Sequence, residues 1–469
     1  MNDTLHSARS SRRHSAYRLL WRWHFYAGLC CLPFVLWLAT TGMIYLFRPQ
    51  LEPLLEQRYA HVGNGLRQPP SAQVAAALRA VPGTVLNAYE LPAAPDAATR
   101  VLLGKGPEII RVFVNPSSLQ VLHVVRENDR FMRVIFHLHG ELLLGDRGSM
   151  LVELAASWTI LMLLTGLYLW WPRHGRLGGA LYPRLRRGGR VFWRDLHAVT
   201  GLWISLFALV LLLSGLPWSK SWGGMLRHAR QLYASAPVAQ DWSTGSAAER
   251  ARIAQQNTPD DAHAMHAGMD MPMAMPMPME DAATAPTPDY APLDRLVPAV
   301  AAQRLAAPVL IAPPSRLKPN WNARSDAQDR SQGVDLVLDA GSGSVTGRID
   351  FAQRPLLDRI IGYGIAIHEG QLFPPLNQIL GVFTALGLIT LCGSSVVLWW
   401  RRRPAGVLGA PPLDQAARYP VAVIVLLGLL GLLLPLLGGS MLAVLVLERC
   451  WLRRIPRMRH FLGLAPPAN

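Results

Sequence analysis

Four stretches of the chain are apolar for long enough to cross a lipid bilayer as helices, which takes about 20 residues. Hydrophobic residues make up 51 % of the 469 residues and charged residues only 16 %, which argues against an ordinary soluble protein. The pattern predicts a membrane α-helical bundle with four main spans. The predicted spans are residues 19–47, 150–171, 193–217 and 379–400.

A fifth apolar block, residues 419–448, is interrupted by Pro435 and by Gly438-Gly439. If this block crossed the membrane once, the arginines of the tail at 449–469 would lie on the opposite side from the other arginine clusters. A hairpin that bends near Pro435 returns them to the same side, although each arm is then short for a full span. We favour a C-terminal hydrophobic hairpin, and a single crossing is the alternative.

The formal net charge of +16 is a topology signal, because the arginines gather beside the spans. Positively charged loops lie on the cytoplasmic side of a membrane. We therefore expect a multi-pass protein in membrane lipid, with a cytoplasmic N-terminus and no nucleic-acid partner. If the source is a Gram-negative bacterium, this is the bacterial inner membrane. The expected cytoplasmic segments are a disordered basic leader at 1–18, loops at 172–192 and 401–418, and the tail.

The two long connections, 48–149 and 218–378, are expected in the periplasm as two α+β modules. In the first, Asn115-Pro116-Ser117-Ser118 is a hairpin turn signal, and Asp339 to Gly343 takes its place in the second. Most of the extra length of the second is a predicted disordered insert at 235–289. The expected helices are 71–79, 131–144, 293–305 and 356–367, and the expected strands are 101–103, 109–114, 121–125, 309–312 and 334–338.

Repeated motifs around four histidines indicate a tandem duplication. His24 and His197 each follow a basic, aromatic segment, with one glycine four residues later and another after eighteen residues. His139 and His368 each precede a span, and 31 residues separate each of them from a Trp-Trp pair. One histidine therefore occupies the same place in each of four membrane segments.

These histidines form two depth-matched pairs. His24 and His197 lie at the cytoplasmic end, His139 and His368 lie near the outer face, and a parallel duplication lets the members of each pair face one another. Two opposed histidines suit a six-coordinate haem iron, whereas zinc prefers four ligands clustered together. We favour haem ligation over the alternative of hydrogen-bonded interfacial residues. Small residues would let helices and a flat macrocycle approach closely: Gly28, Thr41-Gly42, Thr165-Gly166, Gly201, Ser214-Gly215 and Gly393.

Other residues with metal-binding or proton-carrying chemistry have less specific patterns. His137, two residues from His139, is the alternative outer ligand. Glu141, Glu153 and Glu369 could orient ligands or carry protons, but we favour interfacial polar groups. A tract in the insert has thioether and imidazole groups that suit copper, and it is either an accessory copper site or a tolerated low-complexity linker. The tract comprises His263, Met265, His266, Met269, Met271, Met273, Met275, Met277 and Met279.

Motifs for nucleotide and hydrolytic chemistry are absent from the sequence. It has no Gly-x-Gly-x-x-Gly after a strand and no Gly-x-x-x-x-Gly-Lys-Ser/Thr, so a standard NAD(P)H or ATP site is not expected. It also has no Gly-x-Ser-x-Gly and no His-Glu-x-x-His, so a hydrolase has no support. No catalytic residue is assigned.

Several motifs are shared with a known membrane-protein family. They are Trp21-Arg22-x-His24-x-x-x-Gly28, Thr41-Gly42, the Asn115 turn, Leu138-His139-Gly140, Gly148, Trp170-Trp171-Pro172-Arg173, Trp193-Arg194-Asp195-Leu196-His197, Ser214-Gly215-Leu216-Pro217-Trp218 and His368. With them the chain resembles the PepSY-associated transmembrane proteins, which include iron-regulated membrane proteins and haem-containing ferric-siderophore reductases of bacterial inner membranes. The likeness covers roughly residues 18–460, apart from the Met-rich insert.

The resemblance implies two periplasmic PepSY modules and b-type haem, expected to number two, held by His24, His197, His139 and His368. It also implies an oxidoreductase that passes electrons outward to ferric iron in a siderophore or another metal chelate. Some relatives carry a fused flavin- and NADPH-binding domain that this sequence lacks, so we expect a quinol or a separate reductase as donor. The alternatives are a cupric reductase or copper-handling membrane protein, and a non-enzymatic PepSY scaffold that binds a partner.

Overall fold

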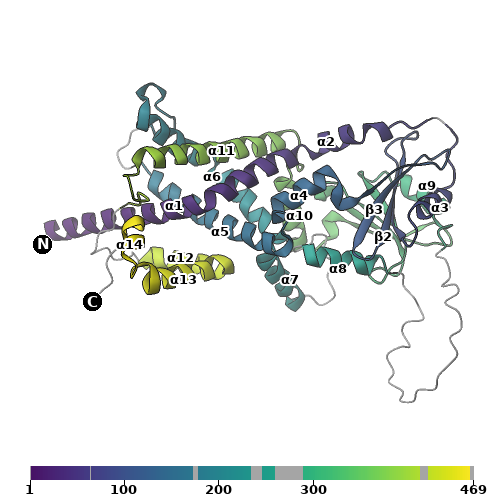
Figure 1. Ribbon diagram of the computed structural model, residues 1–469. Helices are drawn as coiled ribbons and strands as arrows, with labels where there is room; N and C mark the ends of the chain where they lie inside the picture. The colour runs from purple at the N-terminus through teal and green to yellow at the C-terminus, as the bar shows by residue number, and fades with distance from the viewer. Residues whose placement is uncertain are drawn as a thin grey trace, which may run out of the picture. The chain divides into compact units, whose positions relative to one another are not determined.

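The computed structural model describes residues 2–63, 65–172, 178–233, 246–258, 289–411 and 421–464 (Figure 1). The chain divides into two compact units, each assembled from segments that are distant in sequence. The helical unit comprises Met1–Arg48, Val134–Ser246 and Gly364–Asn469. The sheet unit comprises Pro49–Arg133 and Ala247–Tyr363.

Four long helices make up the bundle of the helical unit. Helices α1 (Asn2–Leu46) and α6 (Gly189–Gly215) each pack against both α5 (Gly145–Trp170) and α11 (Leu376–Arg402). This ring of contacts places α1 and α6 at opposite corners of the bundle. These are the helices that carry His24 and His197, so the two histidines come from diagonally opposed helices.

Five helices in the described part of the chain are long and apolar enough to cross a membrane. Four of them correspond to the predicted main spans, and the fifth is the second arm of the C-terminal block. Their bounds are Ala16–Leu46, Gly145–Trp170, Gly189–Trp218, Leu376–Arg402 and Pro435–Leu452.

From Asn2 onward the basic leader is helical, which corrects the prediction that this leader is disordered. Helix α1 begins at Asn2 and runs without a break into the apolar span. Extending a helix that already exists adds one hydrogen bond per residue without a new nucleation cost. The stable span therefore supports a leader whose composition alone gives little reason for structure.

The C-terminal apolar block contains two helices, α12 (Val421–Leu433) and α13 (Pro435–Leu447), separated at Leu434. The chain segments before and after the block meet at a single side chain. Arg22 donates to the carbonyl of Pro411 at 2.9 Å and to the carbonyls of Leu462 and Gly463 at 3.0 and 2.9 Å. The block therefore doubles back, as a hairpin does.

The sheet unit contains one eight-stranded antiparallel sheet of order β4-β3-β2-β1-β5-β6-β7-β8. The two segments predicted to form separate modules each supply four strands, and the halves join where Tyr89 and Glu90 of β1 pair with Ile311 and Leu310 of β5. The strands are β1 (Val85–Glu90), β2 (Thr99–Lys105), β3 (Glu108–Val114), β4 (Val121–Arg126), β5 (Val309–Ala312), β6 (Trp321–Ser325), β7 (Val334–Leu338) and β8 (Val345–Asp350).

Both halves of the sheet close with the same turn. The amide and carbonyl of Asn115 bond to Gln120 and Leu119, and Leu119 has a left-handed φ of 60°. Asp339 makes the same two backbone bonds to Ser344 and Gly343, where φ is 74°. Aspartate thus replaces asparagine without changing the turn, because the side-chain oxygen of either residue can accept the amide protons that follow it.

Helices α3 (Pro70–Ala80) and α9 (Leu293–Ala301) pack against the sheet through its main hydrophobic core, which includes Val74, Tyr89, Leu296 and Trp321. A third helix, α8 (Ser246–Gln256), corrects the prediction that the whole insert at 235–289 is disordered. Immediately after α8, the buried Asn257 accepts from the amide of Asn87 at 2.6 Å and donates to the carbonyl of Gly106 at 2.8 Å. These bonds give the polar α8 segment a fixed place.

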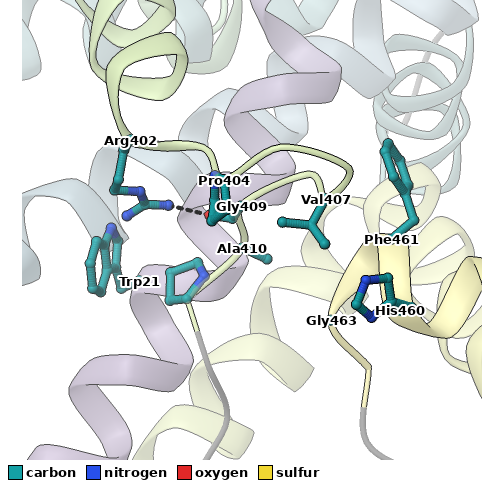
Figure 2. A pocket seen from close by; sticks show the side chains of 10 residues that line it. Trp21, Arg402, Pro404, Val407, Gly409, Ala410, His460, Phe461 and Gly463 are labelled. Carbon is teal, nitrogen blue, oxygen red and sulfur yellow. Dashed lines mark hydrogen bonds between the residues drawn. The ribbon is translucent and has the colours of Figure 1, made fainter.

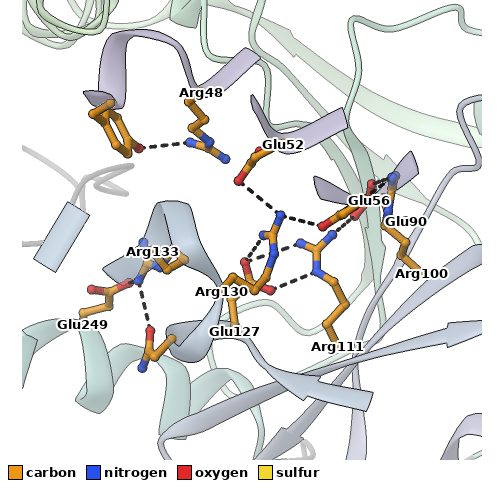
Figure 3. Close-up of polar contacts among 12 residues, drawn as sticks. Arg48, Glu52, Glu56, Glu90, Arg100, Arg111, Glu127, Arg130, Arg133 and Glu249 are labelled. Atoms are coloured by element: carbon orange, nitrogen blue, oxygen red, sulfur yellow. Dashed lines mark hydrogen bonds and ion pairs between the residues drawn. The ribbon is translucent and has the colours of Figure 1, made fainter. Parts of the chain in front are cut away.

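A network of ion pairs fixes α2 (Arg48–Leu55) and the turn after β4 to the sheet (Figure 3). It joins Arg100, Arg111 and Arg130 to Glu52, Glu56, Glu90 and Glu127. Burial alone would raise the pKa of Glu127, but the guanidinium groups of Arg111 and Arg130, at 2.9 and 2.6 Å, lower it to about 2. Glu127 is therefore ionised at neutral pH, as its ion pairs with Arg111 and Arg130 require.

We expect Glu127→Gln to destabilise the sheet unit at neutral pH and to lose this effect in acid. Because the pKa of Glu127 is depressed, its contribution is present above the unfolded value of 4.5 and disappears as pH falls towards about 2. Scanning calorimetry in detergent from pH 7 to pH 2 should show the melting temperatures of wild type and variant converging. Glu108→Gln, at an exposed carboxylate 4.0 Å from Arg126, is the control. A gap that stays constant with pH would contradict the assignment.

Candidate functional site

The structure brings the four predicted histidines together as two pairs in the helical unit. The rings of His24 on α1 and His197 on α6 have centres 6.5 Å apart and planes at 88°. The rings of His139 and His368 have centres 6.2 Å apart and planes at 70°. We call these the inner pair and the outer pair.

The outer pair lies on two short helices that each follow the last strand of a sheet half. His139 is on α4 (Phe131–Glu141) and His368 ends α10 (Leu356–His368). A tight turn after α4 leads directly into α5, and a Cβ on Gly148 would lie 1.7 Å from the carbonyl oxygen of Glu141. Only glycine fits there, so Gly148 allows the close return that fixes α4 against the bundle.

Each of these four histidines has the same kind of hydrogen-bond partner, a threonine or serine hydroxyl on a neighbouring long helix. The bonds join Nδ1 of His24 to Thr165, of His139 to Thr41, of His197 to Ser394 and of His368 to Ser214, each at 3.1 Å. The carbonyl three residues before each hydroxyl also accepts from the ring: Met162, Leu38, Leu391 and Leu211.

These contacts determine which ring nitrogen carries the proton. Each hydroxyl donates its single proton to a backbone carbonyl of its own helix at 2.7–3.1 Å. It can therefore only accept from the imidazole, which makes Nδ1 the protonated nitrogen. The lone pair is then on Nε2, which is the nitrogen through which each of the four rings could bind a metal ion.

Glycines next to three of the hydroxyls let the rings approach the helix backbone. A Cβ on Gly42, Gly166 or Gly215 would lie 3.0–3.2 Å from the Cε1 atom of His139, His24 or His368. Such distances are tighter than ordinary contacts, so any side chain there would press on the ring. At the fourth hydroxyl, that of Ser394, the glycine comes before the serine instead of after it. A Cβ on this Gly393 would meet nothing within 4 Å.

The inner and outer pairs lie near opposite ends of the bundle. His24 and Gly42, which contacts His139, are eighteen residues apart on α1, a rise of about 27 Å along a helix. His197 and Gly215, which contacts His368, have the same spacing on α6. This separation is close to the thickness of the hydrocarbon core of a bilayer, about 30 Å.

Burial keeps the outer pair neutral. It lowers the pKa of His139 to about 4, with a further contribution from the neighbouring His368, and it lowers the pKa of His368 to about 4. At physiological pH both imidazoles therefore retain a free lone pair. A pair of neutral, opposed imidazoles can bind a metal centre that needs two axial nitrogen ligands.

The other candidate residues from the sequence lie outside the two histidine pairs or outside the described part of the chain. The Nδ1 atom of His137 lies 2.5 Å from a carboxylate oxygen of Glu141, so this histidine is turned to its own helix. Glu153 on α5 accepts from the amides of Ser221 and Trp222 at 2.9 and 3.1 Å and caps α7 (Ser221–Tyr233). Glu369 is buried directly after His368. The Met/His tract at 263–279 lies outside the described residues.

Within the described ranges, no three histidine, cysteine, aspartate or glutamate side chains come close enough together to hold a metal ion.

The comparisons with known proteins identify the family of the chain. The family described as PepSY-associated TM region matches residues 21–402, from within the first span to the end of α11. The chain belongs to this family. No curated protein matches it. As a member of the PepSY-associated TM family, it is a multi-pass membrane protein.

Two features of the site were not recognised from the sequence of this PepSY-associated TM protein. The residues Thr41, Thr165 and Ser214 were noted only as small, whereas each also orients a histidine. The sequence signal that could have revealed them is a threonine or serine directly before a glycine. This signal would still have missed Ser394, which comes directly after Gly393. Arg22 was counted only as a positive charge, although it is buried and binds three carbonyls.

We expect Thr41→Val to lower the stability of the helical unit by about 1 kcal/mol, the usual net value of one hydrogen bond. The adjacent Thr40→Val is the matched control, since both hydroxyls donate to a carbonyl four residues earlier but only Thr41 contacts His139. Chemical denaturation in detergent micelles measures the difference. Equal effects of the two substitutions would mean that the contact with His139 contributes no stability.

Proposed function

We propose that this chain is a bacterial inner-membrane b-type haem protein that passes electrons across the membrane and reduces a ferric siderophore on the far side. One haem would be held by His24 and His197 and a second by His139 and His368. The observation that carries the proposal is the presence of two opposed histidine pairs, at opposite ends of one bundle, with Nε2 left for a metal in all four rings.

The spacing of the rings fits axial ligation. A histidine nitrogen binds a metal at about 2 Å and the ring centre lies roughly 1 Å further out, so two axial imidazoles have centres about 6 Å apart. The pairs measure 6.5 and 6.2 Å. Six-coordinate haem takes two protein ligands, whereas a structural zinc site takes four. The histidine pairs therefore support haem better than zinc.

The protein's own groups would determine how such a haem behaves. The hydroxyls of Thr165 and Thr41 hold His24 and His139 in orientation and keep Nδ1 protonated. Bound haem iron supplies reversible one-electron transfer, and two axial histidines leave no open position for oxygen. This combination favours outer-sphere electron transfer.

The acceptor follows from the topology and from iron chemistry. The arginine-rich ends of the spans support a cytoplasmic position for the inner pair and the N-terminus, and a periplasmic position for the outer pair. A ferric siderophore holds iron through hard oxygen ligands, and one electron converts Fe(III) to Fe(II), which those ligands bind more weakly. Electron delivery at the outer pair would therefore release iron from its chelate.

We expect His24→Ala and His368→Ala each to remove a different haem. Redox titration of the purified proteins, followed by the visible absorbance, should show one transition lost in each variant and the other retained. His123→Ala, at a histidine that stacks on Tyr59 in the sheet unit, is the control and should keep both.

The same proteins, in liposomes with an electron donor on the arginine-rich side, should release ferrous iron from a ferric hydroxamate at the opposite face. In both histidine variants the rate of ferrous iron release should fall at least about tenfold, since each variant interrupts electron transfer between the two pairs. If the protein reduced a cupric chelate but not the ferric one, the electron acceptor would be copper instead of iron. A colourless protein from haem-replete cells would overturn the proposal in favour of a scaffold.

A further inference from the structure

A cavity of about 310 Å³ lies in the helical unit at the arginine-rich end of α1 and α11 (Figure 2). The polar side chains on its wall are the guanidinium of Arg402 and the imidazole of His460. Trp21, Val407 and Phe461 give it aromatic and aliphatic surfaces. A mostly apolar cavity of this size with a few polar groups is typical of small-molecule sites.

The walls of this cavity are held by specific contacts. Arg402 lies over the ring of Trp21, 4.7 Å from its centre, and donates to the carbonyl of Gly409 at 2.6 Å. The buried Arg22 ties the loop before the hairpin to the end of α14 (Pro456–Leu462), and the amide of Leu408 donates to the carbonyl of Phe461. The loop and α14 thus form one wall instead of two loose ends.

The cavity adjoins the inner pair. Trp21 and His24 are three residues apart on α1, so a rise of about 4.5 Å, less than one helical turn, separates the aromatic wall from the inner histidine. Trp21 and Arg402 also lie at the ends of their apolar spans. A tryptophan and an arginine at that depth are typical of the membrane–water boundary, which an amphiphile can reach from the lipid.

The lining favours one class of electron donor. A dinucleotide or flavin needs a phosphate site, and the sequence has no glycine-rich phosphate-binding loop. The one guanidinium on the wall already binds Gly409 and covers Trp21. A quinol-like molecule fits this cavity better. Its flat ring matches the aromatic wall, its hydroxyl groups match the imidazole, and its apolar tail matches access from the membrane.

We infer that this cavity is the site where a membrane quinol is oxidised, an inference that rests on the haem function proposed above. One quinol gives up two electrons and two protons and becomes a quinone. The two electrons would pass one at a time to the haem that the inner pair would hold, and onward from there to the haem of the outer pair. The imidazole of His460 accepts the hydroxyl protons one at a time and passes each to water.

The test is anaerobic reduction of the purified full-length protein by decylubiquinol, followed by the haem absorbance, with dithionite as a reductant that does not need the cavity. Val407→Trp fills the cavity and should slow reduction by quinol about tenfold or more by displacing the ring. Ala405→Trp adds the same bulk to an exposed residue of the same loop and should have no effect. His460→Gln should slow reduction by quinol and leave reduction by dithionite unchanged.

The outcomes separate this inference from the haem proposal. If dithionite reduces the wild type but decylubiquinol does not, or if Val407→Trp is reduced by quinol at the wild-type rate, the quinol site is overturned while the haem function stands. If the protein contains no haem, the electron-transfer step fails with the proposed function. Calorimetric binding of decylubiquinone then decides the site: binding lost in Val407→Trp supports it, and no binding to the wild type overturns it.

Discussion

The hydrogen bond from each histidine Nδ1 to a hydroxyl on a neighbouring helix is the contact on which the organisation of the helical unit depends. It crosses from α1 to α5, from α6 to α11, from α4 to α1 and from α10 to α6. Each hydroxyl is already committed to a carbonyl of its own helix, so the bond has one direction and one helix register. A shift of one residue would separate ring and hydroxyl and would remove the common protonation state of the four rings.

Duplication explains how a single chain builds this arrangement twice. In the helical unit, α1, α4 and α5 repeat as α6, α10 and α11, with the same eighteen-residue spacing from histidine to glycine. In the sheet unit, the strand order reads outward from the β1–β5 junction in the same way on both sides, and Asn115 and Asp339 close equivalent turns. The C-terminal hairpin and α14 have no counterpart in the first half. The end of α14 and the loop at 404–411 supply most of the wall of the cavity beside Trp21.

The sequence was most informative where a long-range pattern repeats. The spans follow from uninterrupted apolar length, and the pairing of His24 with His197 follows from duplicated spacing. Strands β1, β6 and β8 escaped prediction. Strands β1 and β6 bury polar residues such as Asn87 and Asn322, which removes the apolar alternation that marks a half-buried strand. The helical leader, the α8 segment and the role of Arg22 depend on contacts with residues far away in the chain, which no local pattern encodes.

The most direct test is a pyridine-haemochrome count on the purified wild-type protein, combined with the electron paramagnetic resonance spectrum of its oxidised form. Two opposed imidazoles per iron give a six-coordinate, low-spin centre, so we predict about two b haems per chain, both low-spin. A single haem would contradict the relay between the two ends of the bundle. A high-spin ferric signal, or no haem in protein from haem-replete cells, would contradict axial ligation by the histidine pairs.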